Sequence, residues 1–305
     1  MEILTLDYND IKNGNQQDFI LNLEKALSTT GFFLLKNHPI DDTLLLKNRE
    51  LFEIFFKSLT EEQRKYYCFP DDAHQRGYTP MKTEIGEFAS VADSKHFYQL
   101  GDNYENPFVS EIPDLQYVSG LLFAQFNSLY RELMKCVALS LDLDKDYFND
   151  EIGNSIMRNI HYPALDNPTV SDDVVREGGN IEGMCASAHT DIDDLTLLHA
   201  TEAGLELKLP NGKYQPIVCN PDVIIVNTGD MLQHLTAGYY KSGVHRVVCE
   251  PGIERFSTPF FGHRIDSASV IPLAKFIGYD VKKYPYTTEG EYLHRRLIDI
   301  GLIKE

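Results

Sequence analysis

Basic residues are scarce in this sequence. The 305 residues include 28 lysines and arginines but 46 aspartates and glutamates, which gives a formal net charge of −18. A broad nucleic-acid interface needs a basic surface, and anionic membranes attract positive charge, so the composition argues against both partners. A small anion can still be bound where a few arginines or lysines converge locally. We therefore expect a small-molecule partner rather than nucleic acid or membrane.

Cysteines are few, and their spacing contains no CxxC pair. An odd number without paired spacing is not a disulfide framework, so we expect free thiols in a reducing compartment. No apolar run approaches the roughly 18 residues of a membrane span. The first residues also lack the basic and apolar segments of a secretory signal. These absences together predict a cytoplasmic protein. The five cysteines are Cys68, Cys136, Cys185, Cys219 and Cys249.

Internal repeats and linkers are absent as well, and 43% of the residues are apolar. We therefore expect a single domain that spans residues 1–305. Helices and loops are expected over about 1–110, and the spacing of apolar residues predicts a long amphipathic helix over 113–141. Short strands with turn signals occupy about 156–265, and a helix returns at about 285–305. Helices followed by many short strands predict a mainly β fold with supporting α-helices, built as a barrel or jelly roll.

The most informative residues are two histidines and an aspartate. His189 and Asp191 are two residues apart, so on an extended strand both side chains point to the same face. His245 lies far along the chain in another strand-like segment. Two imidazoles and one carboxylate are the ligands of a facial-triad Fe(II) oxygenase, in which the metal keeps open positions for O₂ and an organic ligand.

An arginine and a serine follow the second histidine with the same two-residue spacing. Arg255 and Ser257 would share one face of a strand. A guanidinium is always charged and binds carboxylates through two parallel hydrogen bonds, and a serine hydroxyl can donate another. The pattern predicts a site for an organic acid beside the metal.

These motifs occur in an order that resembles one family. The sequence is similar to the isopenicillin N synthase-like branch of the Fe(II)/2-oxoglutarate-dependent dioxygenases over nearly the whole chain. The matching segments read GFFLLKNH at Gly31–His38, RNIHYP at Arg158–Pro163, AHTD at Ala188–Asp191, KSGVHRV at Lys241–Val247 and RFS at Arg255–Ser257.

The resemblance implies a distorted double-stranded β-helix (jelly roll) core and specific roles. His189, Asp191 and His245 would hold Fe(II), while Arg255, Ser257 and Tyr162 would bind 2-oxoglutarate. The implied activity is O₂-dependent oxidation of an unactivated C–H bond by hydroxylation, desaturation or ring closure, with release of succinate and CO₂. Plant members often have asparagine where this chain has Ile160, and the nearby Asn159 would face the other way.

Three alternatives remain open at the level of sequence. Relatives of isopenicillin N synthase use the same iron ligands without 2-oxoglutarate and apply the arginine and serine to other carboxylates. A β-barrel that binds metal without catalysis, such as a ligand sensor, is a second alternative. A zinc hydrolase is a third, but no general-base glutamate stands at a recognisable spacing.

The substrate-binding residues are the hardest to identify from the sequence. Residues 68–110 are rich in glycine, proline and aromatics, and a long loop in a compact domain is often functional. Phe97–Gly101 resembles a family strand that lines the pocket. A cationic residue facing the iron would favour an acidic small molecule such as an amino acid, or another specialised metabolite. The candidate substrate residues are Arg76, Tyr78, Lys82, His96 and Tyr98.

Overall fold

The computed structural model describes residues 2–70, 75–84, 92–102, 105–164, 185–248, 252–276, 278, 280, 282–300 and 302–303. Its helices are α1 (Asn9–Lys12), α2 (Gln16–Thr29), α3 (Asp42–Ser58), α4 (Glu61–Lys65), α5 (Asp114–Ser140), α7 (Asp230–Leu235) and α8 (Glu289–Asp299), with short 3₁₀ turns at Asn149–Glu151 and Ala274–Phe276. Its strands are β1 (Leu4–Asp7), β2 (Phe32–Lys36), β3 (Gly77–Thr79), β4 (His96–Gly101), β5 (Ile156–Tyr162), β6 (Ala186–His189), β7 (Leu195–Ala200), β8 (Leu205–Lys208), β9 (Tyr214–Pro216), β10 (Val223–Thr228), β11 (His245–Val247) and β12 (Arg255–Gly262).

Two sheets form the centre of the molecule. The large sheet has the strand order β1-β2-β10-β7-β12-β5-β4-β3, and the small sheet has the order β6-β11-β8-β9. β1 and β2 are parallel, and the other described strand pairs are antiparallel. Neighbours in the sheets are distant in sequence, as in a jelly roll. The fold is a double-stranded β-helix with supporting helices, as the sequence predicted.

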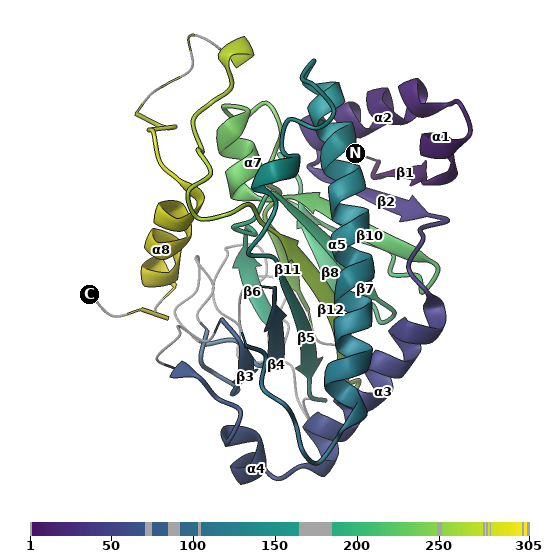
Figure 1. Cartoon of the computed structure of the whole chain (residues 1–305), viewed down its shortest axis with the longest axis vertical. Helices are drawn as coiled ribbons and strands as arrows, with labels where there is room; N and C mark the ends of the chain where they lie inside the picture. Colours follow the sequence, from purple (N-terminus) through teal and green to yellow (C-terminus); the bar gives the residue numbers. More distant parts are fainter. Residues whose placement is uncertain are drawn as a thin grey trace.

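Helix α5 covers the outer face of the large sheet (Figure 1). The pattern of apolar residues predicted this helix, and its buried stripe includes Leu122, Phe126, Leu129 and Leu133. The ring of Phe126 stacks on Phe260 of β12 with 5.7 Å between centroids. This packing determines which residues of β12 face α5, and because side chains alternate along a strand, the residues between them point to the opposite face of the sheet.

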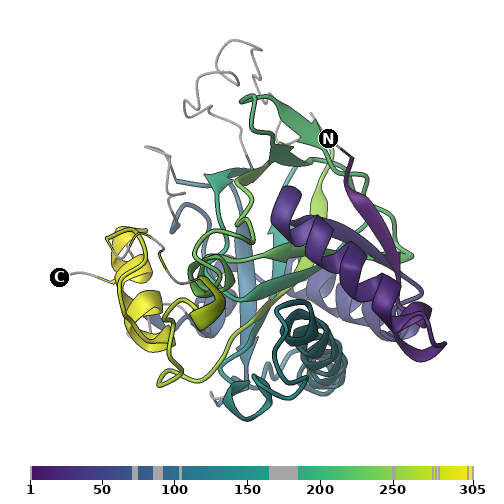
Figure 2. The same cartoon turned by 90° about the horizontal axis from the view of Figure 1, so that it is seen from above.

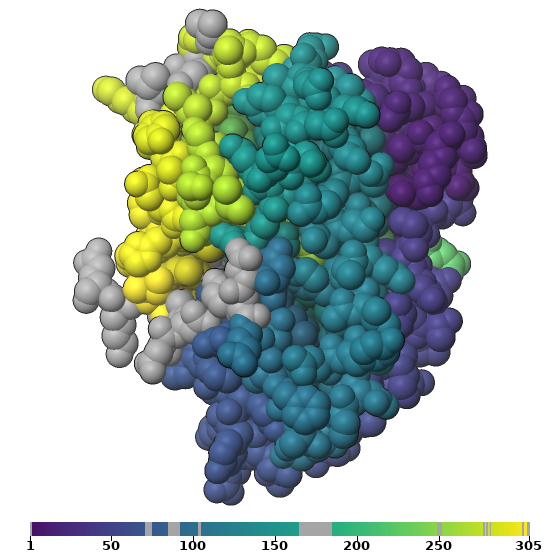
Figure 3. Space-filling view, in the orientation of Figure 1, coloured from purple at the N-terminus to yellow at the C-terminus, as the bar shows by residue number. Residues whose placement is uncertain are grey.

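Helices lie on more than one side of the strands (Figure 2). Seen from above, the C-terminal part of the chain (yellow) lies on the side of the strands opposite the N-terminal helices (purple) (Figure 2). In the space-filling view, the yellow segment that includes α8 covers one flank of the molecule (Figure 3). α8 begins with a capping box, in which Thr288 accepts from the backbone of Glu291. None of the helices in the described ranges combines the length and apolar character that a membrane span requires.

Two sequence expectations need correction. A long irregular segment is expected at 68–110, but β3 and β4 lie within it, and part of it falls outside the described residues. The expectation of free thiols holds for Cys68, Cys136 and Cys219, whereas Cys185 is disulfide-bonded. Cys249 lies outside the described residues. Single cysteines far apart in a sequence give no signal of pairing, because only the fold brings sulfur atoms together.

Candidate metal centre and acid-binding site

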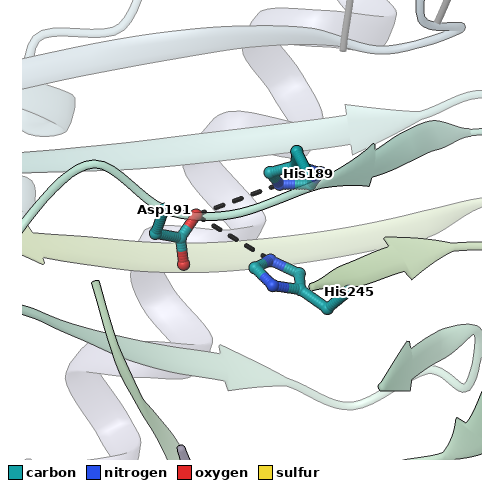
Figure 4. A group of neighbouring side chains, drawn as sticks. All are labelled: His189, Asp191 and His245. Atoms are coloured by element: carbon teal, nitrogen blue, oxygen red, sulfur yellow. Dashed lines mark ion pairs between the residues drawn. The ribbon is translucent and has the colours of Figure 1, made fainter. Parts of the chain in front are cut away.

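Three side chains converge at one end of the small sheet (Figure 4). His189 ends β6, and its backbone pairs directly with His245 at the start of β11. Asp191 follows two residues after His189, and its Oδ1 lies 3.9 Å from Nε2 of His189 and 3.8 Å from Nε2 of His245. One donor atom from each residue lies within 4.8 Å of the other two. This spacing fits a single metal ion bound between the three atoms.

Hydrogen bonds orient both imidazoles toward this centre. Nδ1 of His189 donates to the carbonyl of Ser187 at 2.7 Å, and Nδ1 of His245 donates to the carbonyl of Gly243 at 3.0 Å. A carbonyl oxygen can only accept, so Nδ1 carries the proton and the lone pair of Nε2 faces the centre. Such contacts are typical of metal-binding histidines, because they fix both tautomer and ring orientation.

The carboxylate of Asp191 is held in the same way. Its Oδ2 accepts from Oγ1 of Thr196 at 2.7 Å and from Nδ2 of Asn227 at 2.8 Å. These two bonds leave Oδ1 to face the imidazoles. Thr196 is on β7 and Asn227 is on β10, both in the large sheet. The large sheet therefore positions the carboxylate of Asp191, which follows β6 of the small sheet. Nothing in the sequence alone indicated this role for either residue.

The charges of the three groups suit a cation. Burial, reinforced by neighbouring His245, lowers the pKa of His189 to about 4, so the ring is neutral at neutral pH. Burial opposes ionisation of Asp191, but the adjacent imidazoles and the bonds from Thr196 and Asn227 keep its pKa below the usual value. Neutral imidazoles and an ionised carboxylate are the protonation states that bind a divalent metal.

Arg255 and Ser257 lie together on β12, as predicted. Both are about 5% exposed, and Nη1 of Arg255 donates to Oγ of Ser257 at 3.0 Å. Nε and Nη2 of the same guanidinium are buried without a hydrogen-bond partner in the described structure. Arg255 pairs with Tyr162 across β12 and β5, and the guanidinium carbon lies 5.0 Å from the centre of the tyrosine ring. A buried, incompletely paired cation is costly, so this arrangement fits an anionic ligand.

One cavity of about 170 Å³ lies beside these groups, and Arg255 is not part of its wall. Its wall includes the three converging residues, Tyr162 and Ser257, and further along it reaches α8. The polar or charged residues that line the remainder include Gln75, Glu84, Asp93, Lys95, Gln99, Arg158 and Arg296. The apolar part includes Phe261, Leu293 and Leu297. A ligand in this cavity can therefore reach both the metal centre and a charged wall.

Three predicted substrate residues lie on the wrong side of the sheet. Tyr78 bonds to Nδ1 of His96 at 3.1 Å, and Nε2 of His96 bonds to Nδ1 of His161 at 2.8 Å. These groups pack with Phe56 of α3 on the helical side, and the hydroxyl of Tyr98 donates to the carbonyl of Pro107. The residues that line the cavity here are the alternate ones, Lys95 just before β4 and Gln99 within it. The prediction for Tyr78, His96 and Tyr98 was wrong because it did not determine which face of the strand points toward the cavity.

The other two candidates do not line the cavity either. Lys82 is exposed at a turn with a φ of 60°. The guanidinium carbon of Arg76 lies 4.8 Å from the ring centre of Phe69, and its Nη1 donates to the carbonyl of Glu105. Arg158 is an arginine that does face the cavity, and it opens the RNIHYP motif. Every second residue of a strand shares one face, so the predicted role of Tyr162 could have indicated that Ile160 and Arg158 face the same cavity.

Comparison with known proteins agrees with this geometry. Residues 3–116 match a model described as the N-terminal region of a non-haem dioxygenase in morphine synthesis, and residues 153–264 match the 2OG-Fe(II) oxygenase superfamily. The "Proline hydroxylase buaE" of Petromyces alliaceus is 28% identical, with 98% of this chain and 99% of the relative covered. The "2-oxoglutarate-Fe(II) type oxidoreductase hxnY" of Emericella nidulans is 25% identical over 88% of this chain and 81% of the relative.

A solved structure shows the same similarity. A full-length protein of Neurospora crassa in complex with alpha-KG (2-oxoglutarate) superposes with a TM-score of 0.81 at 26% identity, covering 96% of this chain and 95% of that one. The similarity spans both the helical N-terminal region and the β core. The chain belongs to the 2OG-Fe(II) oxygenase superfamily and is an oxidoreductase that uses Fe(II), O₂ and 2-oxoglutarate to oxidise small molecules.

Proposed function

We propose that His189, Asp191 and His245 bind Fe(II) and that Arg255, Ser257 and Tyr162 bind 2-oxoglutarate. The observation that carries this assignment is the convergence of three oriented donor atoms in one cavity, beside an incompletely paired arginine. These three residues would hold the iron, and a set of two imidazoles and one carboxylate would leave positions on the metal open for the cosubstrate and O₂. When iron is bound, conversion of 2-oxoglutarate and O₂ to succinate and CO₂ supplies the oxidising power for a C–H bond.

The residues of the chain have separate tasks in this proposal. Thr196 and Asn227 hold Asp191 with one oxygen directed at the metal. Arg255 would form a charged pair with the distal carboxylate of 2-oxoglutarate, and Ser257 would donate its hydroxyl to the same group. The ring of Tyr162 packs beside this pair. Burial strengthens the contact, because a charged hydrogen bond gains in a medium of low dielectric constant.

For the substrate we propose a small polar molecule, with an amino acid as the leading class. Charged and amide side chains that line the cavity support this choice, as does similarity to a protein named proline hydroxylase. Hydroxylation is the outcome that the relative's name favours. We further propose that the chain acts as one dioxygenase domain. A cytoplasmic location stays a prediction.

Anaerobic titration with Fe(II) and 2-oxoglutarate tests the assignment. The wild-type protein should develop the visible metal-to-ligand charge-transfer band, and His189→Ala and His245→Ala should lose it. His234→Gln is a matched control, because its imidazole bonds to the carbonyl of Pro285 and is not part of the cavity wall. An undiminished band in both alanine variants would refute the ligand assignment.

A further inference from the structure

Four charged side chains form a cluster in the cavity wall, of which Glu84, Asp93 and Lys95 are buried and Arg158 is partly buried. The guanidinium of Arg158 meets both oxygens of Glu84, with Nη1–Oε2 and Nη2–Oε1 distances of 3.2 Å each. Nζ of Lys95 lies 3.1 Å from Oε2 of Glu84 and 2.8 Å from Oδ2 of Asp93. Nε of Arg158 also donates to Oε1 of Gln99 at 2.6 Å. Two acids and two bases make the set electrically neutral.

The cluster lies beside the metal centre. Oδ1 of Asp93 accepts from the backbone of Ser187 on β6, two residues before His189. Glu84, Asp93, Lys95 and Arg158 line the same cavity as the three converging residues His189, Asp191 and His245. On β5 the cavity-facing row runs from Arg158 through Ile160 to Tyr162. Four residues of a strand span about 13 Å, so the cluster and the proposed 2-oxoglutarate site lie at opposite ends of this row.

Fold stability does not explain this arrangement. Burying ion pairs costs desolvation free energy that their attraction repays poorly, and apolar residues of similar size are often at least as stabilising. The cluster nevertheless keeps its charges: burial opposes ionisation of Glu84, yet Arg158 and Lys95 lower its pKa to about 2. A retained set of charges that faces a cavity beside a metal centre indicates a functional role.

Arg158 is held rigidly in position. Its guanidinium carbon lies 3.9 Å from the ring centre of Phe97 and 5.2 Å from that of Phe261. An arginine side chain has five N–H donors. In Arg158, hydrogen bonds to Gln99 and Glu84 use two, and an ion-pair contact of Nη2 with Glu84 engages a third, so at least two are left. An ammonium has three donors, and Lys95 uses two of them on Glu84 and Asp93. The cluster therefore offers donors for an anion next to a carboxylate that can accept from a cation.

We propose that Glu84, Lys95 and Arg158 recognise the head group of the substrate and that the substrate is a zwitterion of the amino-acid class. Arg158 and Lys95 bind its carboxylate, and Glu84 binds its ammonium or secondary amine. A neutral set of paired charges matches a zwitterion, whereas a substrate with a single charge would leave one member of the cluster unbalanced. This inference rests on the function proposed above and specifies its substrate side.

The test uses the protein loaded with Fe(II) and 2-oxoglutarate without O₂. The common amino acids are added singly, and binding is followed by the change in the charge-transfer band. The amino acid that binds best is then compared with its N-acetyl derivative, its amide and the matching acid without an amine, with thymine as a neutral heterocycle. We expect free amino acids to perturb the band and, once O₂ is admitted, to stimulate succinate formation. Equal binding of thymine or the N-acetyl compound, or no response to any amino acid, would overturn the proposal.

Two variants separate the roles of the charges. Arg158→Met keeps a long side chain between the two rings and should raise the Kd of the amino acid roughly 10- to 150-fold, the loss expected for a charged hydrogen bond. Glu84→Gln keeps the shape and should reduce the preference for the amino acid over its amine-free analogue by a similar factor. An unchanged preference in Glu84→Gln, or an unchanged Kd in Arg158→Met, would contradict the assignment.

A control variant and the charge-transfer band distinguish failure of the substrate inference from failure of the proposed function. Arg49→Met removes another arginine that is ion-paired, to Glu53 and Glu202, and packed on an aromatic ring, that of Phe256, but outside the cavity wall. It should leave amino-acid binding unchanged. If the wild-type protein forms no band with Fe(II) and 2-oxoglutarate, the proposed function fails. If the band forms but no amino acid perturbs it, only the substrate inference fails.

Discussion

Replacing Arg255 with methionine should separate binding from stability. Methionine keeps much of the length of the side chain but removes the charge. In the protein without ligand, Nε and Nη2 of this arginine are buried without hydrogen-bond partners among the described residues. With 2-oxoglutarate bound, we propose that these same atoms hold its distal carboxylate. The substitution should therefore weaken the complex while costing the ligand-free fold very little.

The magnitudes follow from the contacts. A hydrogen bond to a charged group contributes about 1.5–3 kcal/mol, and the carboxylate would keep its bond to Ser257, so we expect a loss of about 3 kcal/mol and a Kd for 2-oxoglutarate raised about 150-fold. An unsatisfied buried group costs about 1–3 kcal/mol, and the Arg255–Ser257 bond contributes about 1 kcal/mol. Arg255→Met removes both the penalty of the unsatisfied N–H groups and the stabilising bond to Ser257, and these two changes oppose each other. The unfolding free energy of the ligand-free variant should therefore lie within about 1 kcal/mol of the wild-type value or above it.

Two measurements check this prediction. Anaerobic titration of the charge-transfer band gives the Kd of 2-oxoglutarate, and urea unfolding without ligand gives the stability. Arg264→Met is the control, because this buried arginine is ion-paired with Asp194, Glu289 and Glu151. Removing it leaves carboxylates uncompensated and should cost about 3–5 kcal/mol of stability. A Kd in Arg255→Met within about fivefold of wild type is far less than the loss of charged hydrogen bonds demands, and it would refute the cosubstrate assignment.

Three further predictions concern the metal, the pH response and the core. Asn227→Ala removes a bond to Asp191 and should weaken Fe(II) binding about 10- to 100-fold, measured by metal titration; equal affinity would contradict the positioning role. Burial lowers the pKa of His96 to about 3, so below about pH 6.5 the unfolded chain binds a proton that the folded one excludes. Stability should therefore fall by up to about 1.4 kcal/mol per pH unit as pH drops below about 6.5, and His96→Gln should reduce that slope in urea unfolding. Phe126→Ala should cost about 3–5 kcal/mol in the same assay, because the ring packs on Phe260 in the core.

Local spacing determined the metal and acid sites. His189 with Asp191, and Arg255 with Ser257, are pairs whose shared direction depends only on an extended backbone. The spacing therefore predicted their common face before any fold was known. The order of the motifs added the distant His245 through family resemblance. The structure brings the three proposed iron ligands and Ser257 together in one cavity wall, with Arg255 bonded to Ser257 on β12.

The substrate wall could not be predicted from spacing. A strand has two faces, and composition did not show which residues of His96–Gly101 face the metal. The packing of Phe56 and α3 against His96 and His161 made that choice. The sequence contained both Lys95 and Gln99 in this part of the chain, but only the sheet order placed Gln99 opposite Arg158.

The sequence by itself indicated the chemistry of this protein, because two of the three proposed iron ligands, and the proposed acid-binding pair, stand at short, fixed spacings. The tertiary structure decided what the cavity can recognise. Glu84 lies in a loop, Lys95 lies just before β4, and Arg158 lies on β5, which is distant in sequence. Their charges form one neutral cluster with Asp93 only after the large sheet is assembled. Electrostatic interactions depend on distance in space, and distance in space is what the linear sequence does not contain.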